Sequence, residues 1–352
     1  MDFALTGTQQ DLQSSVRRYL AGRYPPDRIG ELADAGRSDL DAWPELTRQG
    51  WWDPDLGLVE LAVLAEESGR ALHPVPWWGT AGLAAPAYHA AGTVPPGPAT
   101  LADGAGSCRA VPAGTGWRLA GRVGAVVDAG PASELVVAAG TGSGTGLFTV
   151  PPDGPGVTRT GAGGAGGGID PLRGTAGLAL AGAPARQLVG PPEAGPLLAA
   201  IRHRGTALLA AEGIGVAARA LEIAVEHART RVQFGRPIGA YQAVSHRLAE
   251  CYADLELARS LAYRAACVLA GPEGDPAEAL AGAVHASRRA AVTVCESAIQ
   301  VCGGTGVTWE FPLHRWYRRA LWLDAYHAAG PDPLAVLAGA VLDRHRDGTP
   351  CR

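Results

Sequence analysis

One segment in the second half of the chain places two arginines, two aromatic rings and two amides on a Gly/Pro-rich turn. It links the ends of two predicted helices and reads Arg231-Val-Gln-Phe-Gly-Arg-Pro-Ile-Gly-Ala-Tyr-Gln. Such a turn can present a guanidinium to a pyrophosphate and an aromatic ring to an adenine. The segment is therefore a candidate nucleotide-binding element.

A second segment ends a predicted helix in a glycine turn and reads Gln300-Val-Cys-Gly-Gly-Thr-Gly-Val. Glycines at this point allow backbone N–H groups to approach a phosphate closely. A plain helix C-terminus followed by a surface loop explains either segment equally well when each is taken alone.

A third pattern, formed by Gly161, Gly163 and Gly166, matches the GxGxxG spacing of dinucleotide-binding turns. Such a turn lies between a strand and a helix. Here more glycines and Ile169-Asp-Pro follow, and they cannot open a helix. Because the chain holds 49 glycines, we interpret this match as a result of composition.

Composition excludes several classes of site. The 352 residues include no lysine, which removes Schiff-base chemistry, pyridoxal-phosphate attachment and a P-loop lysine. A net charge of −4 gives no basic surface for nucleic acid. The six cysteines form no CxxC pair and no spacing with histidine that would hold zinc, so we expect no metal site.

The chain has the composition of a globular protein, with 47% hydrophobic and 18% charged residues. The N-terminus lacks a basic leader followed by an apolar core, and no stretch reaches the ~18 apolar residues of a membrane span. We therefore expect a cytoplasmic protein without a membrane-embedded part.

Three zones of different periodicity follow one another. Residues 1–95 show helical spacing in two segments, the first with an apolar face of Leu12, Val16, Tyr19 and Leu20 and the second spanning 58–71. Residues 96–190 are rich in Gly, Pro, Thr and Val, and short apolar runs at 134–139, 146–151 and 175–180 predict the strands of a small β-domain.

From residue 191 to residue 352 the helical period returns. Apolar periodicity predicts helices at 197–227, about 248–262, about 277–301 and, as a fourth candidate, 333–344. Long sequential helices joined by short loops are typical of an up-and-down bundle. The predicted domains are thus a helical domain (1–95), a β-domain (96–190) and a helical bundle (191–352).

Taken together, the two candidate segments resemble the acyl-CoA dehydrogenase family, whose motifs are RxxFGxPIxxxQxxxH and, some seventy residues later, QxxGGxGxxxExPxxRxYRxA. The resemblance extends to the first residues, to Glu66-Glu67-Ser-Gly-Arg-Ala-Leu-His-Pro-Val-Pro and to Gly116-Trp-Arg-Leu-Ala-Gly-Arg. It implies an α+β fold with an N-terminal helical domain, a central small β-domain and a C-terminal four-helix bundle.

The resemblance also implies an FAD cofactor at a subunit interface. In the family, the matching positions grip the adenine-dinucleotide end of an FAD held mainly by the neighbouring subunit. They correspond here to Arg231, Phe234, Tyr241, Gln242, Gln300, Val301, Cys302, Gly303 and Gly304. The same resemblance implies an oligomer, an acyl-CoA substrate and an electron-transferring flavoprotein as electron acceptor.

The chain departs from the family at the catalytic base. The family removes the α-proton of an acyl-CoA with a glutamate in a Tyr-Glu-Gly-Thr turn, and the equivalent position holds His327. A second base position, in the segment 201–206, contains no acid. The remaining acids Glu212, Glu250 and Glu310 are interpreted as solvated or capping residues.

The β-domain departs from the family as well. The family's flavin-facing strand reads Trp-Ile-Thr-Asn, and register from Gly121 places Ala125-Val-Val-Asp128 there. Only a faint match, Leu101-Ala-Asp-Gly-Ala-Gly-Ser107, remains of a preceding family loop. The residues that serve a neighbour's cofactor are thus kept, and those for the chain's own flavin ring and base are not.

Three hypotheses follow from this asymmetry. The chain is a subunit of a heteromer whose partner, a second acyl-CoA dehydrogenase chain, supplies the glutamate. Alternatively, it is a homomeric flavoenzyme with a relocated base. In the third hypothesis it is a non-oxidative enzyme in which His327 acts as general acid/base, with tryptophans 309, 316 and 322 walling the pocket.

Overall fold

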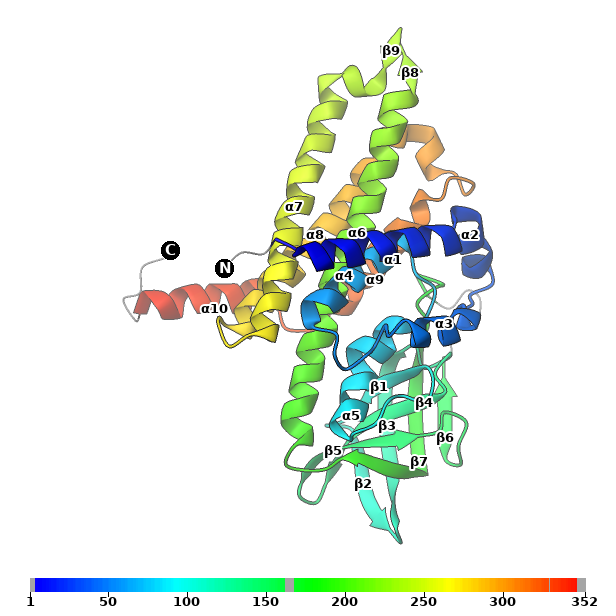
Figure 1. Cartoon of the computed structure of the whole chain (residues 1–352), viewed down its shortest axis with the longest axis vertical. Helices are drawn as coiled ribbons and strands as arrows, with labels where there is room; N and C mark the ends of the chain where they lie inside the picture. The colour runs from blue at the N-terminus through cyan, green and yellow to red at the C-terminus, as the bar shows by residue number, and fades with distance from the viewer. Residues whose placement is uncertain (1–3, 162–167, 329, 347–352) are drawn as a thin grey trace. The chain divides into compact units, whose positions relative to one another are not determined.

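The computed structural model describes residues 4–161, 168–328 and 330–346, and its elements follow the order helices, strands, helices (Figure 1). This order and the mixed α+β character confirm the predicted fold class. None of the helices in these three ranges combines the length and hydropathy that crossing a bilayer requires.

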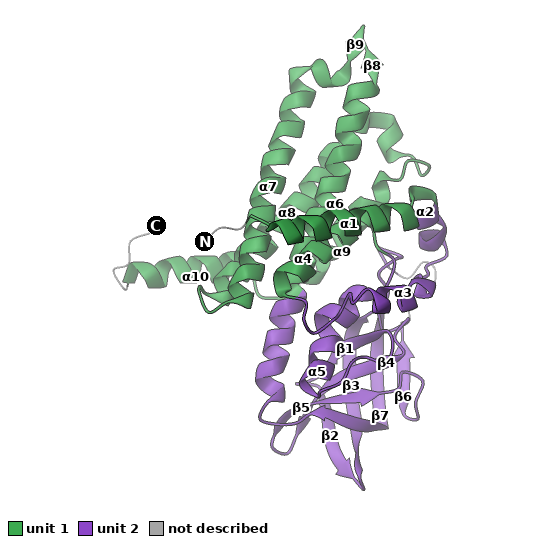
Figure 2. Cartoon of the chain, in the orientation of Figure 1, with its two compact units in different colours: residues 1–27, 57–73, 206–352 green, residues 28–56, 74–205 purple. Residues whose placement is uncertain are grey.

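The chain divides into two compact units that do not follow three consecutive segments (Figure 2). Unit 1 contains residues 1–27, 57–73 and 206–352, and unit 2 contains residues 28–56 and 74–205. N-terminal helices therefore contribute to both units. The boundaries 1–95, 96–190 and 191–352 stay a prediction about domains.

The long helices of the second half belong mainly to unit 1. They are α6 (Ala194–Thr230), α7 (Gln242–Ala270), α8 (Pro276–Cys302), α9 (Leu313–Ala328) and α10 (Pro333–Arg346). The helices predicted at 197–227, 248–262 and 277–301 are confirmed as α6, α7 and α8. The fourth candidate, 333–344, is α10, and α9 is a further helix that the sequence analysis did not predict.

The signal for α9 was present in its apolar spacing. Five of its seven buried residues step by 3, 4, 3 and 4 along one face, and they are Leu313, Trp316, Ala320, Leu323 and His327. Pro312 and the glycine-rich residues before it suggested a surface loop. They instead precede a helix start, where proline is well tolerated.

The two N-terminal helices predicted in unit 1 are confirmed as α1 (Gly7–Arg23) and α4 (Leu58–Ala71). Thr6 caps α1 in a capping box with Gln9, and α1 buries Val16 and Leu20. Helix α4 buries nine residues, from Leu61 to Gly69, including the carboxylates of Glu66 and Glu67. Such a helix has no solvated face over most of its length.

Unit 2 holds the remaining short helices and the strands. The helices are α2 (Pro26–Asp34, which begins in unit 1), η1 (Leu40–Ala42), α3 (Trp43–Arg48), η2 (Trp78–Ala84) and α5 (Ala85–Ala90). The strands are β1 (Ala99–Asp103), β2 (Cys108–Ala113), β3 (Gly116–Val127), β4 (Glu134–Thr141), β5 (Gly144–Val150), β6 (Val157–Thr160) and β7 (Thr175–Val189). The strands predicted at 134–139, 146–151 and 175–180 are β4, β5 and the first part of β7.

The strands form one sheet of order β1-β4-β2-β3-β7-β5, with β6 on β7 and a further β4–β5 pairing that closes the order into a ring. Most neighbours are antiparallel, whereas β1–β4 and β2–β4 are parallel. Leu119, Leu135, Val137 and Phe148 are fully buried inside this sheet. The predicted small β-domain thus has its own apolar core.

Helices α4 and α6 cross in unit 1 at a contact between backbones. A Cβ atom added at Gly69 of α4 would overlap the carbonyl oxygen of Glu212, and one added at Gly215 of α6 would overlap the carbonyl oxygen of Glu66. Only glycine permits helices to approach this closely. The two glycines therefore fix how the N-terminal helix α4 packs against the bundle helix α6.

We expect the substitution Gly215→Ala to lower the free energy of unfolding by about 3 kcal/mol, since the methyl group meets rigid backbone rather than a movable side chain. Urea unfolding at neutral pH measures the change. Gly22→Ala in α1 is the matched control, because nothing lies within 4 Å of its added Cβ. The control should stabilise the chain by up to about 1 kcal/mol; equal behaviour of the two variants would contradict the close crossing.

Candidate functional site

The first motif forms a two-stranded hairpin at the end of the bundle, between α6 and α7 (Figure 1). Its strands are β8 (Val232–Gln233) and β9 (Arg236–Pro237), and every residue from 231 to 237 is exposed. Phe234 lies at the tip with 92% of its surface accessible and a φ of +50°. A bulky side chain at positive φ costs about 1 kcal/mol or more, so this exposed ring is held in an unfavourable backbone conformation.

Contacts within the hairpin fix its shape and leave Arg231 at the surface. The Ile238 N–H donates to the Arg231 carbonyl at 2.8 Å, and the Tyr241 hydroxyl donates to the Gln233 carbonyl at 3.1 Å. The Arg236 guanidinium lies over the Tyr241 ring, 4.1 Å from its centroid. Arg236 and Tyr241 thus stabilise the turn, while the Arg231 and Phe234 side chains are exposed and are not part of the core of unit 1.

The second motif lies at the same end of the bundle. Helices α7 and α8 are joined by the short loop 271–275 and have 29 and 27 residues, so the start of α7 and the end of α8 are neighbours. Gln242 begins α7, and Gln300 lies in the last turn of α8, both exposed. The backbone then turns at Gly303, with a φ of +59°, into a short 3-10 helix, η4 (Gly303–Val307). The two motifs, predicted separately, therefore lie toward the same end of unit 1.

Within the second motif the residues differ in accessibility. Gly303 and Gly304 are exposed, Val301 is half-buried and the Cys302 thiol is buried. Burial raises the pKa of that thiol to about 11, so it is a neutral packing group. A cofactor at this turn would contact backbone and the Gln300 amide rather than the cysteine side chain.

His327 lies in the last turn of α9 and not in a loop, and its side chain is buried. Its Nε2 has no hydrogen-bond partner among the residues that the structure describes. Burial first, and then the positive charge of Arg288, lower its pKa to about 4, against smaller opposing effects of Asp324 and Glu212. His327 is therefore a neutral imidazole on the core face of a helix.

Glu212 is one of the acids that the sequence suggested to be solvated or capping, and this was wrong. It is 3% exposed in the middle of α6 and accepts a hydrogen bond at 2.5 Å from Arg319, which is fully buried. Its carboxylate is therefore engaged in a buried ion pair and not directed at a substrate. Glu250 and Glu310 are exposed, as expected of solvated acids.

In the other candidate base region, 201–206, the ionisable side chains are all basic. Arg202 forms a bidentate ion pair with Asp103 at 2.6 and 3.0 Å. Arg204 donates to the Ala81 carbonyl at 3.0 Å, and burial lowers its pKa to about 10. Asp103 is the acid of the faint loop match, and its carboxylate is thus engaged by Arg202.

Of the four residues aligned with the family's flavin-facing strand, Ala125 is exposed and the other three are buried. Val126 and Val127 are buried at the end of β3, and Asp128, also buried, has a φ of +59°. Gly163 and Gly166 of the GxGxxG match lie outside the described residues. In the parts of the chain that the structure describes, no group of His, Cys, Asp and Glu side chains could hold a metal ion.

The three tryptophans suggested as pocket walls have different surroundings. Trp316 and Trp322 are buried, and Trp322 stacks on Tyr326 at 5.2 Å between ring centroids. Trp309 is 60% exposed and stacks on His314 at 4.5 Å. Trp316 also donates through Nε1 to the Arg70 carbonyl at 3.0 Å, which ties α9 to α4.

Comparison with known proteins assigns the family. The model of the acyl-CoA dehydrogenase C-terminal domain matches residues 202–332. Acyl-CoA dehydrogenase IpdE2 of Mycobacterium tuberculosis is 42% identical over 113 residues, which is 32% of this chain and 34% of that protein. The Tcur3481–Tcur3483 steroid acyl-CoA dehydrogenase, solved as a variant, is 29% identical with a TM-score of 0.81 over 96% of this chain and 99% of the other. The chain belongs to the acyl-CoA dehydrogenase family.

Other family members show the same relationship. The ChsE4–ChsE5 complex from Mycobacterium tuberculosis contains a chain that is 27% identical, with a TM-score of 0.81 over the full length of both chains. The human mitochondrial short-chain specific acyl-CoA dehydrogenase is 32% identical over 256 residues, 69% of this chain and 60% of the human enzyme. In sequence, the chain matches about a third of the length of the first curated relatives.

The buried state of His327 makes the stability of this acyl-CoA dehydrogenase family member depend on pH. The folded-state pKa of about 4 lies below the ordinary histidine pKa of 6.5, so the unfolded chain binds a proton first as the pH falls. From this group alone we expect the free energy of unfolding to be about 2 kcal/mol lower at pH 5 than at pH 7.

Urea midpoints of the wild type and of His327→Gln, each at pH 7 and pH 5, test this. The variant should lose about 2 kcal/mol less than the wild type between these two pH values. An identical pH dependence of the two proteins would place His327 in contact with solvent in the native state.

Proposed function

We propose that this chain is a subunit of a heteromeric, FAD-dependent acyl-CoA dehydrogenase whose partner chain supplies the catalytic glutamate. The observation that carries the proposal is the state of His327. The optimal pKa of a catalytic base lies near the working pH, and a buried imidazole with a pKa of about 4 is a weak base at neutral pH. The ion-paired Glu212 offers no replacement.

The residues of the hairpin fit one end of the cofactor. The accessible Arg231 guanidinium can pair with a pyrophosphate, the exposed Phe234 ring can pack on an adenine, and the Gln242 and Gln300 amides can donate and accept hydrogen bonds beside them. The buried valines 126 and 127 offer no polar group to a flavin ring. The fit is therefore to the nucleotide end of an FAD whose ring lies in the partner.

In the proposed reaction a base takes the α-proton of an acyl-CoA, and the electron pair of the broken α C–H bond forms the α,β double bond while the β-hydrogen leaves with its own electron pair as a hydride. When bound, FAD accepts this hydride, and an electron-transferring flavoprotein is the proposed electron acceptor. This chain's own residues take no proton in that scheme: they bind and orient the nucleotide and complete the interface.

The names of two relatives support a heteromer and a substrate class. ChsE4–ChsE5 and Tcur3481–Tcur3483 are both named as pairs, and the second is called a steroid acyl-CoA dehydrogenase. Both likenesses cover almost the whole chain. We therefore propose an acyl-CoA with a bulky, steroid-like chain as the substrate of the assembly.

The two other hypotheses have less support. A homomeric flavoenzyme with its own relocated base requires an accessible acid near a flavin ring, and neither base position provides one. A non-oxidative enzyme that uses His327 requires an imidazole that titrates near neutral pH, whereas burial lowers this pKa to about 4.

The complex of this chain with its acyl-CoA dehydrogenase partner is purified from the native cells. In this complex Arg231→Ala should remove most of the FAD, since the Arg231 guanidinium pairs with the pyrophosphate of the FAD that the partner holds. The flavin-to-protein ratio, read from the visible spectrum, measures the loss. Arg229→Ala is the matched control, because Arg229 is exposed at the end of α6 outside the motif. Unchanged flavin stoichiometry in Arg231→Ala would refute the proposal.

A further inference from the structure

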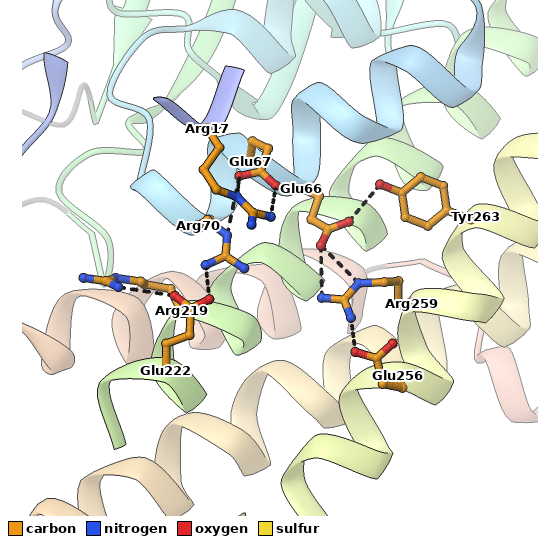
Figure 3. A network of polar contacts seen from close by, with 9 residues as sticks. All are labelled: Arg17, Glu66, Glu67, Arg70, Arg219, Glu222, Glu256, Arg259 and Tyr263. Atoms are coloured by element: carbon orange, nitrogen blue, oxygen red, sulfur yellow. Dashed lines mark hydrogen bonds and ion pairs between the residues drawn. The ribbon is translucent and has the colours of Figure 1, made fainter. Parts of the chain in front are cut away.

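Unit 1 contains a cleft of about 580 Å³ that neither motif uses. Its walls come from helices α1, α4 and α7, and the side chains that matter for its chemistry are those of Gln13, Arg17, Glu66, Arg70, Arg259 and Ser260. None of them belongs to the hairpin, to the Gln300 turn or to the surroundings of His327. Figure 3 shows the polar network that forms one side of the cleft.

The carboxylate oxygens in this network are already occupied. Glu66 accepts from Arg259 Nε at 3.1 Å through one oxygen and from the Tyr263 hydroxyl at 2.8 Å through the other (Figure 3). Glu67, behind it, accepts from Arg17 Nε and Nη2 at 2.9 and 2.7 Å. Both side chains are almost fully buried, so their negative charge is neutralised where it stands.

The guanidinium groups, in contrast, keep unused donors. Arg17 binds Glu67 through Nε and Nη2, so its Nη1 donors are not used by this ion pair. The Arg17 side chain is 44% accessible. Arg70 donates through Nη1 to Glu222 at 2.5 Å, and its Nε is buried 3.5 Å from Glu67, so Nη2 is the Arg70 nitrogen that is left for a further acceptor. An arginine has five N–H donors, so each group can serve a carboxylate and a further acceptor.

The excess of unused N–H donors over free acceptor oxygens determines which ligand the cleft can bind. Its lining contains three guanidinium groups and one carboxylate, and the Gln13 amide adds a neutral donor. Glu67, Glu222 and Glu256 pair with these guanidiniums from outside the lining, so the preference of the cleft comes from its unused N–H donors and not from an excess of positive charge. A carboxylate or phosphate oxygen accepts from such donors more strongly than a neutral group does, whereas a cation meets no accessible carboxylate oxygen on Glu66.

We propose that this cleft binds a small oxyanion, a phosphate or carboxylate group, between α1, α4 and α7. The anion contacts the remaining N–H donors of Arg17 and Arg70, with Ser260 and Gln13 at the rim. Because its contacts come from three helices that are distant in the sequence, bound anion stabilises unit 1 by mass action. The site is independent of the FAD-binding motif.

Isothermal titration of the purified full chain with inorganic phosphate, and separately with succinate, at low ionic strength tests the proposal. We expect saturable binding of at least one of the two anions, and which one binds distinguishes a phosphate site from a carboxylate site. Ser260→Glu places a negative charge in the cleft at an exposed helical position that the network does not use, and it should weaken binding at least about tenfold.

Two further variants serve as controls. Ser15→Glu adds the same charge on the face of α1 opposite Gln13 and Arg17, and Arg231→Ala removes the hairpin arginine. Both should keep the wild-type affinity. Any of three results would overturn the proposal: no saturable binding of either anion, equal affinity of Ser260→Glu and wild type, or loss of binding in Arg231→Ala. The last result would place the bound anion at the hairpin.

Discussion

The packing of α4 is the constraint on which unit 1 depends. Gly69 and Gly215 let α4 lie backbone to backbone on α6, and this brings the adjacent carboxylates of Glu66 and Glu67 into the interior. Each buried carboxylate then requires a cation, and the two are served from different helices, by Arg259 of α7 and Arg17 of α1. One close helix crossing therefore determines where two other helices, α1 and α7, must lie. Such ion pairs need not add much net stability, but removing one partner leaves a buried charge that costs about 3–5 kcal/mol.

Sequence periodicity was sufficient for elements that bury one apolar face, such as α1, α7 and α8, and for short strands bounded by turn residues. It failed where local signals conflicted: glycines and Pro312 concealed the start of α9, although the buried face from Leu313 to His327 follows a helical period. Charged residues were the other source of error. Glutamate is usually a surface residue, and only the position of Arg319, 107 residues away, shows that Glu212 is buried and paired. Pairing over such a separation is a property of the fold that no local pattern contains.

The two halves of the candidate site were predictable to different degrees. The hairpin and the Gln300 turn could be found from motif spacing, and antiparallel helices of nearly equal length explain why they lie toward the same end of the bundle. The chemistry at the base position could not be found in this way, because it depends on burial. A histidine on the core face of α9 is neutral, whereas the same residue in a loop would titrate near neutral pH. This difference is what favours a subunit that completes a partner's site over an enzyme with its own base.

The central claim, that this chain serves the flavin of a partner, is tested most directly by the visible spectrum and native mass of the chain purified alone and incubated with FAD. The account predicts a protein without flavin absorbance, which gains the flavin bands only when it is purified together with a second acyl-CoA dehydrogenase chain. A yellow homo-oligomer with one FAD bound per chain and activity on acyl-CoA would contradict it.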